Sequence, residues 1–383
     1  MLGITTSYHL NPILLKSGQK NLASLLVNGK VVANRDVREY YRDLDSLKPA
    51  VKSAFEYLDK YYDCIVAEGA GSPVELNLME KDLSNIYIAT EFNTKIILVA
   101  DIEKGGVFAS IWGVYNLLPQ QLKENVIGVI VNKFRGDLTL FDEGIRIIEE
   151  EFNIPVLGVL PYLPFNLGFE DSQSLMNYQQ KSNVTAKRVA VIAYPTMSNY
   201  NDFEALIADP NIALEFIKNN ISLKGFDQII LPGSKLVIKD LEWLKASGLF
   251  EQLKTAKTDI LGICGGYQMM FEKICDPLAI ESSSPTEVEG LGFIDDVILF
   301  QEEKLVRSQT YQLFGKTIKG FEIHHGTSQK YPLYFEKGHI KGTFVHGLFD
   351  DDVFGIYKKE TIEHFVNEMK THLDVERMMK DVL

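Results

Sequence analysis

The chain has 383 residues, 46% of them hydrophobic, and a formal net charge of −13. This composition is typical of a globular protein with room for two domains. The acidic balance argues against a broad nucleic-acid or membrane surface, although a local pocket can still bind an anion. The three cysteines are too scattered for a disulfide framework, and the N-terminus lacks a signal-peptide pattern. We therefore expect a protein of the reducing cytoplasm that binds neither nucleic acid nor membrane.

Short apolar runs, rich in β-branched residues, are predicted to form buried strands. They span residues 63–69, 95–101, 126–133, 155–161, 188–195, 228–234 and 259–266. Amphipathic stretches at 46–62 and 140–152 have the spacing of helices. This alternation predicts an α/β fold of mainly parallel sheets flanked by helices, in which ligands gather at the carboxyl ends of the strands.

The polar stretch 177–187 precedes a predicted strand and is typical of an inter-domain linker. We therefore expect two domains, 1–185 and 186–383. A long surface loop inside a single domain is the alternative.

Cys264 lies where a predicted strand meets a predicted helix that begins at Tyr267. Gly262 and the pair Gly265–Gly266 allow the sharp turn and the close approach that a nucleophile on such an elbow needs. The helix N-terminus favours the thiolate, and the amide of Gly265 can face an oxyanion on an attacked carbonyl. The alternative is a tight glycine turn with an incidental cysteine.

A cysteine nucleophile needs a base, and His346 ends another strand-like run. Taken alone, one of seven histidines is more often a core or surface residue, so the base role depends on the pairing with Cys264. The turn LPGSK ends a further strand, and its amides at Gly233 or Ser234 are candidates for a second oxyanion donor.

The cysteine elbow, the LPGSK turn and the late His346 together resemble a class I, triad-type glutamine amidotransferase domain with a flavodoxin-like sheet. The resemblance implies that Cys264 attacks the side-chain amide of glutamine, which releases ammonia and leaves a glutamyl thioester. His346 would protonate the ammonia and then activate water. Gln268 would help to hold glutamine, with Gly233 and Gly265 beside it.

One position departs from the common triad of that family. A glutamate usually follows the histidine by two residues, and here that position is Leu348. A subgroup that includes the cobyric acid synthases works without this glutamate, so Leu348 indicates that subgroup among the amidotransferases. Another group must then orient His346.

Segments along nearly the whole chain resemble the successive signatures of the cobyric acid synthase family. They are residues 11–16, 27–32, 38–41, 68–78, 101–110, 131–137, 194–206 and 322–326. The resemblance implies an enzyme that uses ATP and glutamine to amidate peripheral carboxylates of an adenosylated corrin in cobalamin synthesis. Its first domain would be P-loop-NTPase-like and would use Mg²⁺ while a carboxylate is activated by phosphorylation. The muramyl-ligase partner amidotransferases share the cysteine domain but not the segments of the first half, so we rank them lower.

Four residues in the first half lie at the ends of predicted strands. Glu68 is a candidate metal ligand, and Asp101 is a candidate catalytic carboxylate. Asn132 and Lys133 end a third strand, where related folds contact the adenine ring. Each also has a simpler interpretation, because acidic strand ends often cap the next helix and Asn-Lys is a frequent loop pair.

A phosphate-binding loop of the G-x-x-x-x-G-K-[ST] type, which the family has near its start, is not found in this sequence. We therefore expect weak ATP binding and an open edge in the first sheet. Three interpretations stay open: a synthase whose given sequence lacks its N-terminal segment, a short glutaminase that needs a helper chain for ATP chemistry, or a remnant that binds a corrin or a partner without turnover. The presence of Cys264, Gln268 and His346 argues against the third.

Overall fold

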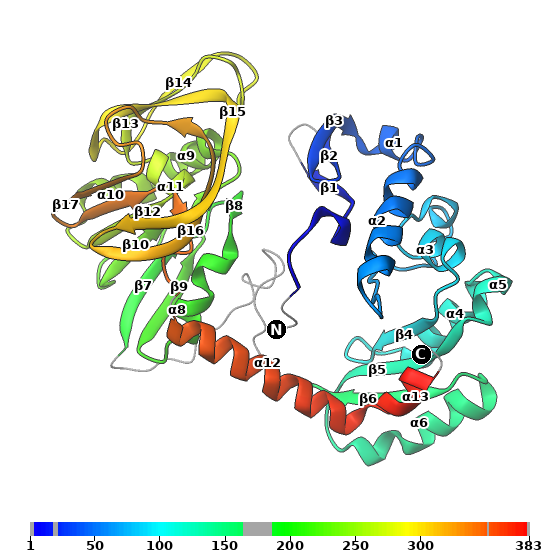
Figure 1. Cartoon of the computed structure of the whole chain (residues 1–383). Coiled ribbons are helices and arrows are strands. Elements are labelled where there is room, and N and C mark those ends of the chain that lie inside the picture. The colour runs from blue at the N-terminus through cyan, green and yellow to red at the C-terminus, as the bar shows by residue number, and fades with distance from the viewer. Residues whose placement is uncertain (1–3, 18–21, 164–185, 351, 381–383) are drawn as a thin grey trace. The chain divides into compact units, whose positions relative to one another are not determined.

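The structure is a computed structural model that describes residues 4–17, 22–163, 186–350 and 352–380. The chain divides into two compact units (Figure 1). Unit 1 comprises Met1–Phe165 and Glu363–Leu383, and unit 2 comprises Asn166–Ile362.

Unit 1 begins with an antiparallel sheet that the sequence analysis did not single out. Its strands are β1 (Ile13–Ser17), β2 (Leu22–Val27) and β3 (Lys30–Asp36). Asn28 and Gly29 turn the chain between β2 and β3 with φ values of 51° and 76°, the conformation that Asn-Gly favours in a two-residue hairpin. Leu25 packs in a small core with Leu44 and Leu47.

The parallel sheet of unit 1 has three strands in the order β4-β5-β6. The strands are β4 (Ile96–Asp101), β5 (Val126–Phe134) and β6 (Val156–Pro161), which confirms the predictions at 95–101, 126–133 and 155–161. The helices are α1 (Val37–Tyr40), α2 (Lys48–Tyr61), α3 (Ile86–Glu91), α4 (Val107–Leu117), α5 (Gln120–Lys123) and α6 (Asp142–Arg146), followed by a π-helical turn at Ile147–Glu151. Val129 and Val131 are fully buried, where they pack with Ile111 and Ile148.

The strand predicted at 63–69 is wrong, because these residues form no ladder and Val66 is 91% exposed. A run of apolar residues becomes a strand only where a neighbouring strand accepts its backbone hydrogen bonds. Among the described residues β4 pairs with β5 alone, so β4 is an edge strand, and its Val99 is 65% exposed. The segment that carries Glu68 therefore has no regular secondary structure and is mostly exposed.

Unit 2 is built on a six-stranded sheet in the order β17-β18-β12-β10-β7-β9, parallel except where β17 joins. Its strands are β7 (Lys187–Ile192), β9 (Ile212–Ile217), β10 (Gln228–Leu231), β12 (Asp259–Ile263), β17 (Tyr334–Lys337) and β18 (Ile340–Thr343). The helices that belong to it are α8 (Glu204–Ala208), α9 (Val237–Ala246) and α10 (Leu249–Thr255). Ile229, Ile230 and Leu231 of the central β10 are fully buried. The α/β fold with mainly parallel sheets is thus confirmed.

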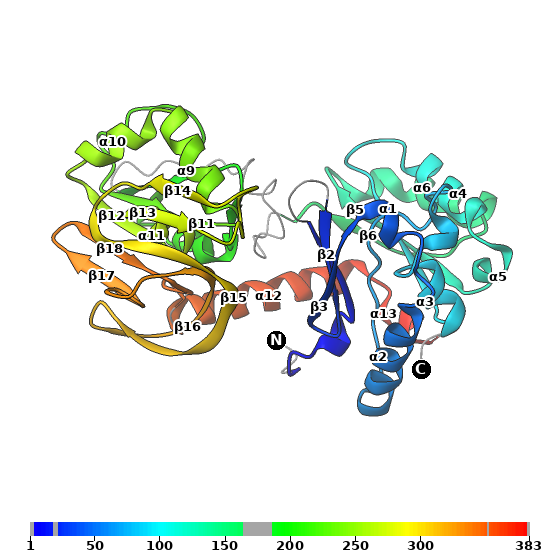
Figure 2. The same cartoon turned by 90° about the horizontal axis from the view of Figure 1, so that it is seen from above.

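A second, mostly antiparallel sheet of unit 2 was not predicted. Its order is β14-β13-β15-β16-β19, with β13 (Phe271–Asp276), β14 (Thr286–Glu289), β15 (Ile294–Leu313), β16 (Lys316–Thr327) and β19 (Val345–His346). Strands β15 and β16 form one long hairpin (Figures 1 and 2). The short edge strand β19 pairs with Phe321 and Glu322 of β16, which places His346 at the rim of this sheet.

The division of the chain differs from the expected domains at the C-terminal end. The boundary expected near residue 185 lies at the end of the stretch 164–185, which is outside the described residues. The segment 363–383 belongs to unit 1, although we expected it in a second domain of 186–383.

Backbone contacts with β6 explain why the C-terminal segment belongs to unit 1. Helices α12 (Asp352–His372) and α13 (Val375–Lys380) are joined at Leu373, which forms an antiparallel bridge with Gly158. The amide of Asp374 donates a 2.8 Å hydrogen bond to the carbonyl of Leu157. Among the described helices, none is long and apolar enough to cross a membrane.

Gly158→Ala should detach this segment from β6, because the new methyl carbon would lie 2.2 Å from the carbonyl oxygen of His372. We expect the free energy of unfolding to fall by about 1–3 kcal/mol, as for other overpacked sites, and proteolysis within 363–380 to become faster. Gly113→Ala is the matched control, since it faces open space within α4 and should be neutral or slightly stabilising. Unchanged stability of the Gly158→Ala variant would contradict this account of the contact.

Candidate active site

Cys264 occupies a strained elbow directly after β12. Its φ of 50° and ψ of −105° lie outside the regions that non-glycine residues usually adopt, and such strain concentrates at functional sites. Tight packing around the elbow requires glycine on both sides of it. A Cβ added to Gly262 would lie 2.3 Å from Sδ of Met270. A Cβ added to Gly266 would lie 2.0 Å from the carbonyl oxygen of Leu231.

The helix after the cysteine is shorter than expected. Helix α11 contains only Gly265–Gln268, and β13 begins at Phe271, so the prediction of a longer helix from Tyr267 is wrong. The pairing of β13 with β14 and β15 supplies the backbone hydrogen bonds that a continued helix would have made. A four-residue helix contributes little dipole field, so the charge of a Cys264 thiolate must be balanced mainly by neighbouring side chains.

His346 is fully buried beside Cys264 and is held by a carboxylate. Nδ1 of His346 lies 2.7 Å from Oδ2 of Asp202, while the other carboxylate oxygen accepts the amide of Gly347 at 2.9 Å. A carboxylate only accepts, so Nδ1 carries a proton and Nε2 is the nitrogen that can exchange one. Burial lowers the pKa of His346, but the charges and hydrogen bonds of Cys264 and Asp202 outweigh it and raise the pKa to about 10.

Asp202 is the orienting group that the triad lacked in the sequence, and sequence reasoning did not identify it. It lies on the 3₁₀ turn η5 (Tyr200–Phe203), 144 residues before His346, and is 5% exposed. The available signals were Leu348, which left the histidine without its usual partner, and the two acidic residues within 194–206, Asp202 and Glu204. Leu348 packs against the cores of unit 2 instead.

The LPGSK turn lies against the cysteine elbow. Strand β11 (Gly233–Ser234) pairs with β8 (Met197–Ser198), and a Cβ added at Gly265 would lie 2.6 Å from the backbone nitrogen of Ser234. A Cβ at Gly233 would lie 3.1 Å from Cε1 of His346. The structure therefore brings Gly233, Ser234 and Gly265 to the same place as the nucleophile and the base.

Asp240 fixes the position of this turn. Its carboxylate is fully buried and accepts hydrogen bonds from the Thr196 amide (3.1 Å), the Thr196 hydroxyl (2.7 Å) and the Ser234 hydroxyl (2.5 Å). Burial raises the pKa of Asp240, although these hydrogen bonds oppose the increase. Such a network holds the backbone amides of the turn in place before a substrate arrives.

Gln268 is 2% exposed, and its Oε1 has no hydrogen-bond partner among the described residues. This oxygen lies next to Gly326, where an added Cβ would be 2.4 Å from it. A buried acceptor without a partner is costly, so this atom is suited to a donor that arrives with a ligand.

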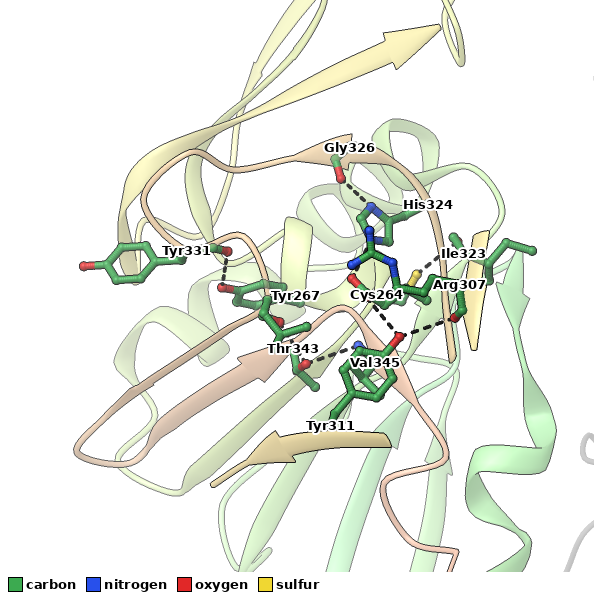
Figure 3. A network of polar contacts seen from close by, with 12 residues as sticks. Cys264, Tyr267, Arg307, Tyr311, Ile323, His324, Gly326, Tyr331, Thr343 and Val345 are labelled. Carbon is green, nitrogen blue, oxygen red and sulfur yellow. Dashed lines mark hydrogen bonds and ion pairs between the residues drawn. The ribbon is translucent and has the colours of Figure 1, made fainter. Parts of the chain in front are cut away.

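A network of buried polar side chains, which includes Tyr311 and His324, lies near Cys264 (Figure 3). Nε2 of His324 lies 3.4 Å from Oε2 of Glu322, and the Tyr311 hydroxyl donates to Oε1 of Glu322 at 3.0 Å. Burial alone would raise the pKa of Glu322, but the hydrogen bonds from His324 and Tyr311 lower it. Ile323, between Glu322 and His324 in the sequence, accepts a 3.6 Å hydrogen bond from Sγ of Cys264.

Three of the candidates in unit 1 lie together at the ends of β4 and β5. Asp101 is paired with Asn132 in the sheet register, and Nζ of Lys133 lies 2.8 Å from Oδ2 of Asp101. The Lys133 hydrogen bond holds the pKa of Asp101 below its usual range, even though its partial burial acts in the opposite direction. Lys133 itself has a φ of 62°, a left-handed conformation that places its side chain back toward β4.

Glu68 lies apart from that group, in the wall of a cavity of about 1150 Å³ that is also lined by Glu75 and Asp82. Within the described ranges, no cluster of three or more histidine, cysteine, aspartate or glutamate side chains has the geometry of a metal site. Mg²⁺ that bridges phosphates needs only one or two protein carboxylates, with waters and phosphate oxygens as its other ligands. Glu68 in the wall of a roomy cavity, as one such carboxylate, fits that donor set.

Comparisons with known proteins match both halves of the chain. Residues 188–357 match the CobB/CobQ-like glutamine amidotransferase domain, and residues 27–165 match an AAA domain. A cobyric acid synthase of Acinetobacter baylyi is 60% identical over 100% of this chain and 86% of its own length, and one of Clostridium botulinum is 36% identical over 99% and 80%. A solved glutamine amidotransferase, 15% identical, aligns with 45% of this chain and 97% of its own at a TM-score of 0.34. The resemblance noted in the sequence is thus confirmed, and the chain belongs to the cobyric acid synthase family.

Proposed function

We propose that this chain is a glutamine-hydrolysing amide ligase that transfers ammonia to peripheral carboxylates of a corrin in cobalamin biosynthesis. The observation that carries the proposal is the buried His346–Asp202 pair beside a cysteine on a strained elbow. Membership in the cobyric acid synthase family supports the corrin as the substrate class.

The first half of the hydrolysis uses the elbow directly. The Cys264 thiolate attacks the side-chain carbonyl carbon of glutamine, a C–S bond forms, and backbone amides near Ser234 and Gly265 stabilise the oxyanion. When the oxyanion collapses, the C–N bond breaks and His346 gives its Nε2 proton to the nitrogen, so that ammonia leaves. The unpartnered Oε1 of Gln268 accepts a hydrogen bond from the bound glutamine.

The second half restores the cysteine. His346, now neutral, takes a proton from water, the hydroxide attacks the thioester carbon, and the C–S bond breaks to release glutamate. Asp202 stabilises the charged imidazole in both halves and keeps its proton on Nδ1. The catalytic set we propose is therefore Cys264 and His346, with Asp202 as the positioning residue.

Carboxylate activation would use unit 1. ATP with Mg²⁺ supplies the phosphoryl group that converts a carboxylate into an acyl phosphate, which ammonia can attack. Glu68 would bind the metal from the cavity wall, and Asn132 and Lys133 would contact the nucleotide. Lys133 and Asp101 are 43% and 33% exposed, and an ion pair that exposed contributes only about 0–1 kcal/mol. The pair can therefore open at little cost and present both charges to a ligand.

Cys264→Ala should abolish glutamine hydrolysis and leave the fold intact, because a methyl group cannot form the thioester. The measurement is glutamate release by the purified full chain. Cys275→Ala is the matched control, since this second cysteine lies on β13 with its sulfur near Glu287. Hydrolysis that survives in the Cys264→Ala variant would refute the assigned nucleophile.

Asp202→Asn should reduce kcat for glutamine hydrolysis by about 10²-fold or more, the lower range for loss of general acid–base function. The amide keeps the shape but removes the charge that favours the imidazolium. Asp259→Asn, at the exposed start of β12, is the control and should be silent. A change of less than twofold in kcat would show that Asp202 does not orient the base.

Asp101→Asn should leave glutamine hydrolysis within about twofold of wild type and reduce corrin amidation at least tenfold, followed by mass spectrometry of the corrin. Asp142→Asn, exposed at the start of α6, is the matched control in the same unit. If the wild-type chain hydrolyses glutamine but amidates no corrin, the glutaminase that needs a helper chain becomes the better description.

A further inference from the structure

The base of the proposed glutaminase has a second side-chain partner that the mechanism does not use. Nδ2 of Asn199 lies 2.9 Å from Nε2 of His346. This is the nitrogen that must exchange a proton with Cys264, with ammonia and with water, because Nδ1 is committed to Asp202. The contact is therefore at the reactive atom of the base.

An imidazole nitrogen has one in-plane position for a partner, a lone pair when neutral and an N–H when charged. A side-chain amide can occupy that position in both states, because it donates from Nδ2 and, after rotation, accepts at Oδ1. Asn199 thus competes with Cys264 for Nε2 whatever the charge on the ring. The Cys264 sulfur has an alternative partner too, since it donates to the carbonyl of Ile323 at 3.6 Å.

The backbone around Asn199 is anchored by hydrogen bonds, while the residue itself is partly exposed. Asn199 is the N-cap of η5 with φ 55° and ψ 54°, a left-handed conformation that asparagine tolerates. Ser198 before it pairs with Gly233, and the Asp202 amide donates to the Asn199 carbonyl at 3.1 Å. Asn199 is partly exposed, whereas Asp202 and Phe203 on the same turn are buried. The same short segment therefore contacts both ring nitrogens, Nδ1 through the buried carboxylate of Asp202 and Nε2 through the amide of the partly exposed Asn199.

We propose that Asn199 is a removable cap on His346, which keeps glutamine hydrolysis in a slow resting state until its side chain turns away from Nε2. The inference rests on the proposed glutaminase function. The cap limits proton transfer and not glutamine binding, so its removal should act on kcat and leave KM unchanged. If Asn199 merely supported the turn, its substitution would lower kcat instead, because the loss of that support would slow the reaction.

Asn199→Gly removes the amide and suits the left-handed backbone. We expect kcat for glutamine hydrolysis without ATP or corrin to rise about fivefold, the factor that corresponds to one hydrogen bond, with KM within twofold. Asn201→Gly is the matched control, because this asparagine lies exposed on the same turn. An Asn199→Gly variant that is equal to or slower than the control variant would overturn the proposal.

Alkylation of Cys264 by iodoacetamide gives a readout that needs no turnover. With the cap removed, His346 can pair fully with the sulfur, so the thiolate and its alkylation rate should increase by a similar factor; an unchanged rate would count against the cap. If Asn199→Gly does not fold, Asn199→Ala removes the same amide, although alanine is more strained than glycine in the left-handed backbone. If the wild-type chain hydrolyses no glutamine even with ATP and corrin, the proposed function fails. The alkylation rates would still test whether Asn199 caps His346.

Discussion

The buried contact between His346 and Asp202 is the constraint on which the rest of the site depends. A fully buried imidazole that must become charged needs a fixed counter-charge, and the 2.7 Å hydrogen bond to Asp202 provides it. This contact joins the turn η5 to the edge strand β19, which in turn pairs with β16. The ring of Phe321 on β16 stacks on His346 with centroids 5.0 Å apart. The turn η5 and two strands of one sheet, β16 and β19, therefore meet at this imidazole, and the cysteine elbow lies beside the same ring.

Sequence patterns predicted the parts of this arrangement whose causes are local. Strand β12 follows from a buried apolar run. The elbow at Cys264 follows from its flanking glycines, where neighbouring atoms leave no room for a larger side chain. Asp202 could not be predicted in the same way, because its role is created by a contact 144 residues away. The long hairpin was missed for another reason: residues 301–310 of β15 are almost all exposed, so neither alternation nor an apolar run marks them as a strand. The strand predicted at 63–69 had the opposite fault, an apolar run without a neighbour to pair with.

The charged candidate site residues of unit 1 are held by fewer contacts than those of unit 2. The carboxylates of Asp202 and Asp240 are buried and bound on several sides, so their positions are set before any ligand arrives. Asp101 and Lys133 are held mainly by each other at a partly exposed strand end, and Glu68 is exposed in a cavity wall. An acyl-transfer site needs donors fixed in advance, whereas a site for a multiply charged ligand can be organised by that ligand. The contrast between the units is the one expected for the two half-reactions proposed here.

The proposed competition between Asn199 and Cys264 for Nε2 of His346 follows from the need of a buried ring nitrogen for a hydrogen-bond partner. Burial removes water from the ring, so each nitrogen must be satisfied by protein when no substrate is present. Asp202 satisfies Nδ1 permanently, because a carboxylate is needed there at every step. Nε2 cannot have a permanent partner, because three different groups must reach it in turn during hydrolysis. A neutral amide on a partly exposed residue meets both demands: it satisfies the nitrogen in the empty site, and it can be displaced for about the free energy of one hydrogen bond.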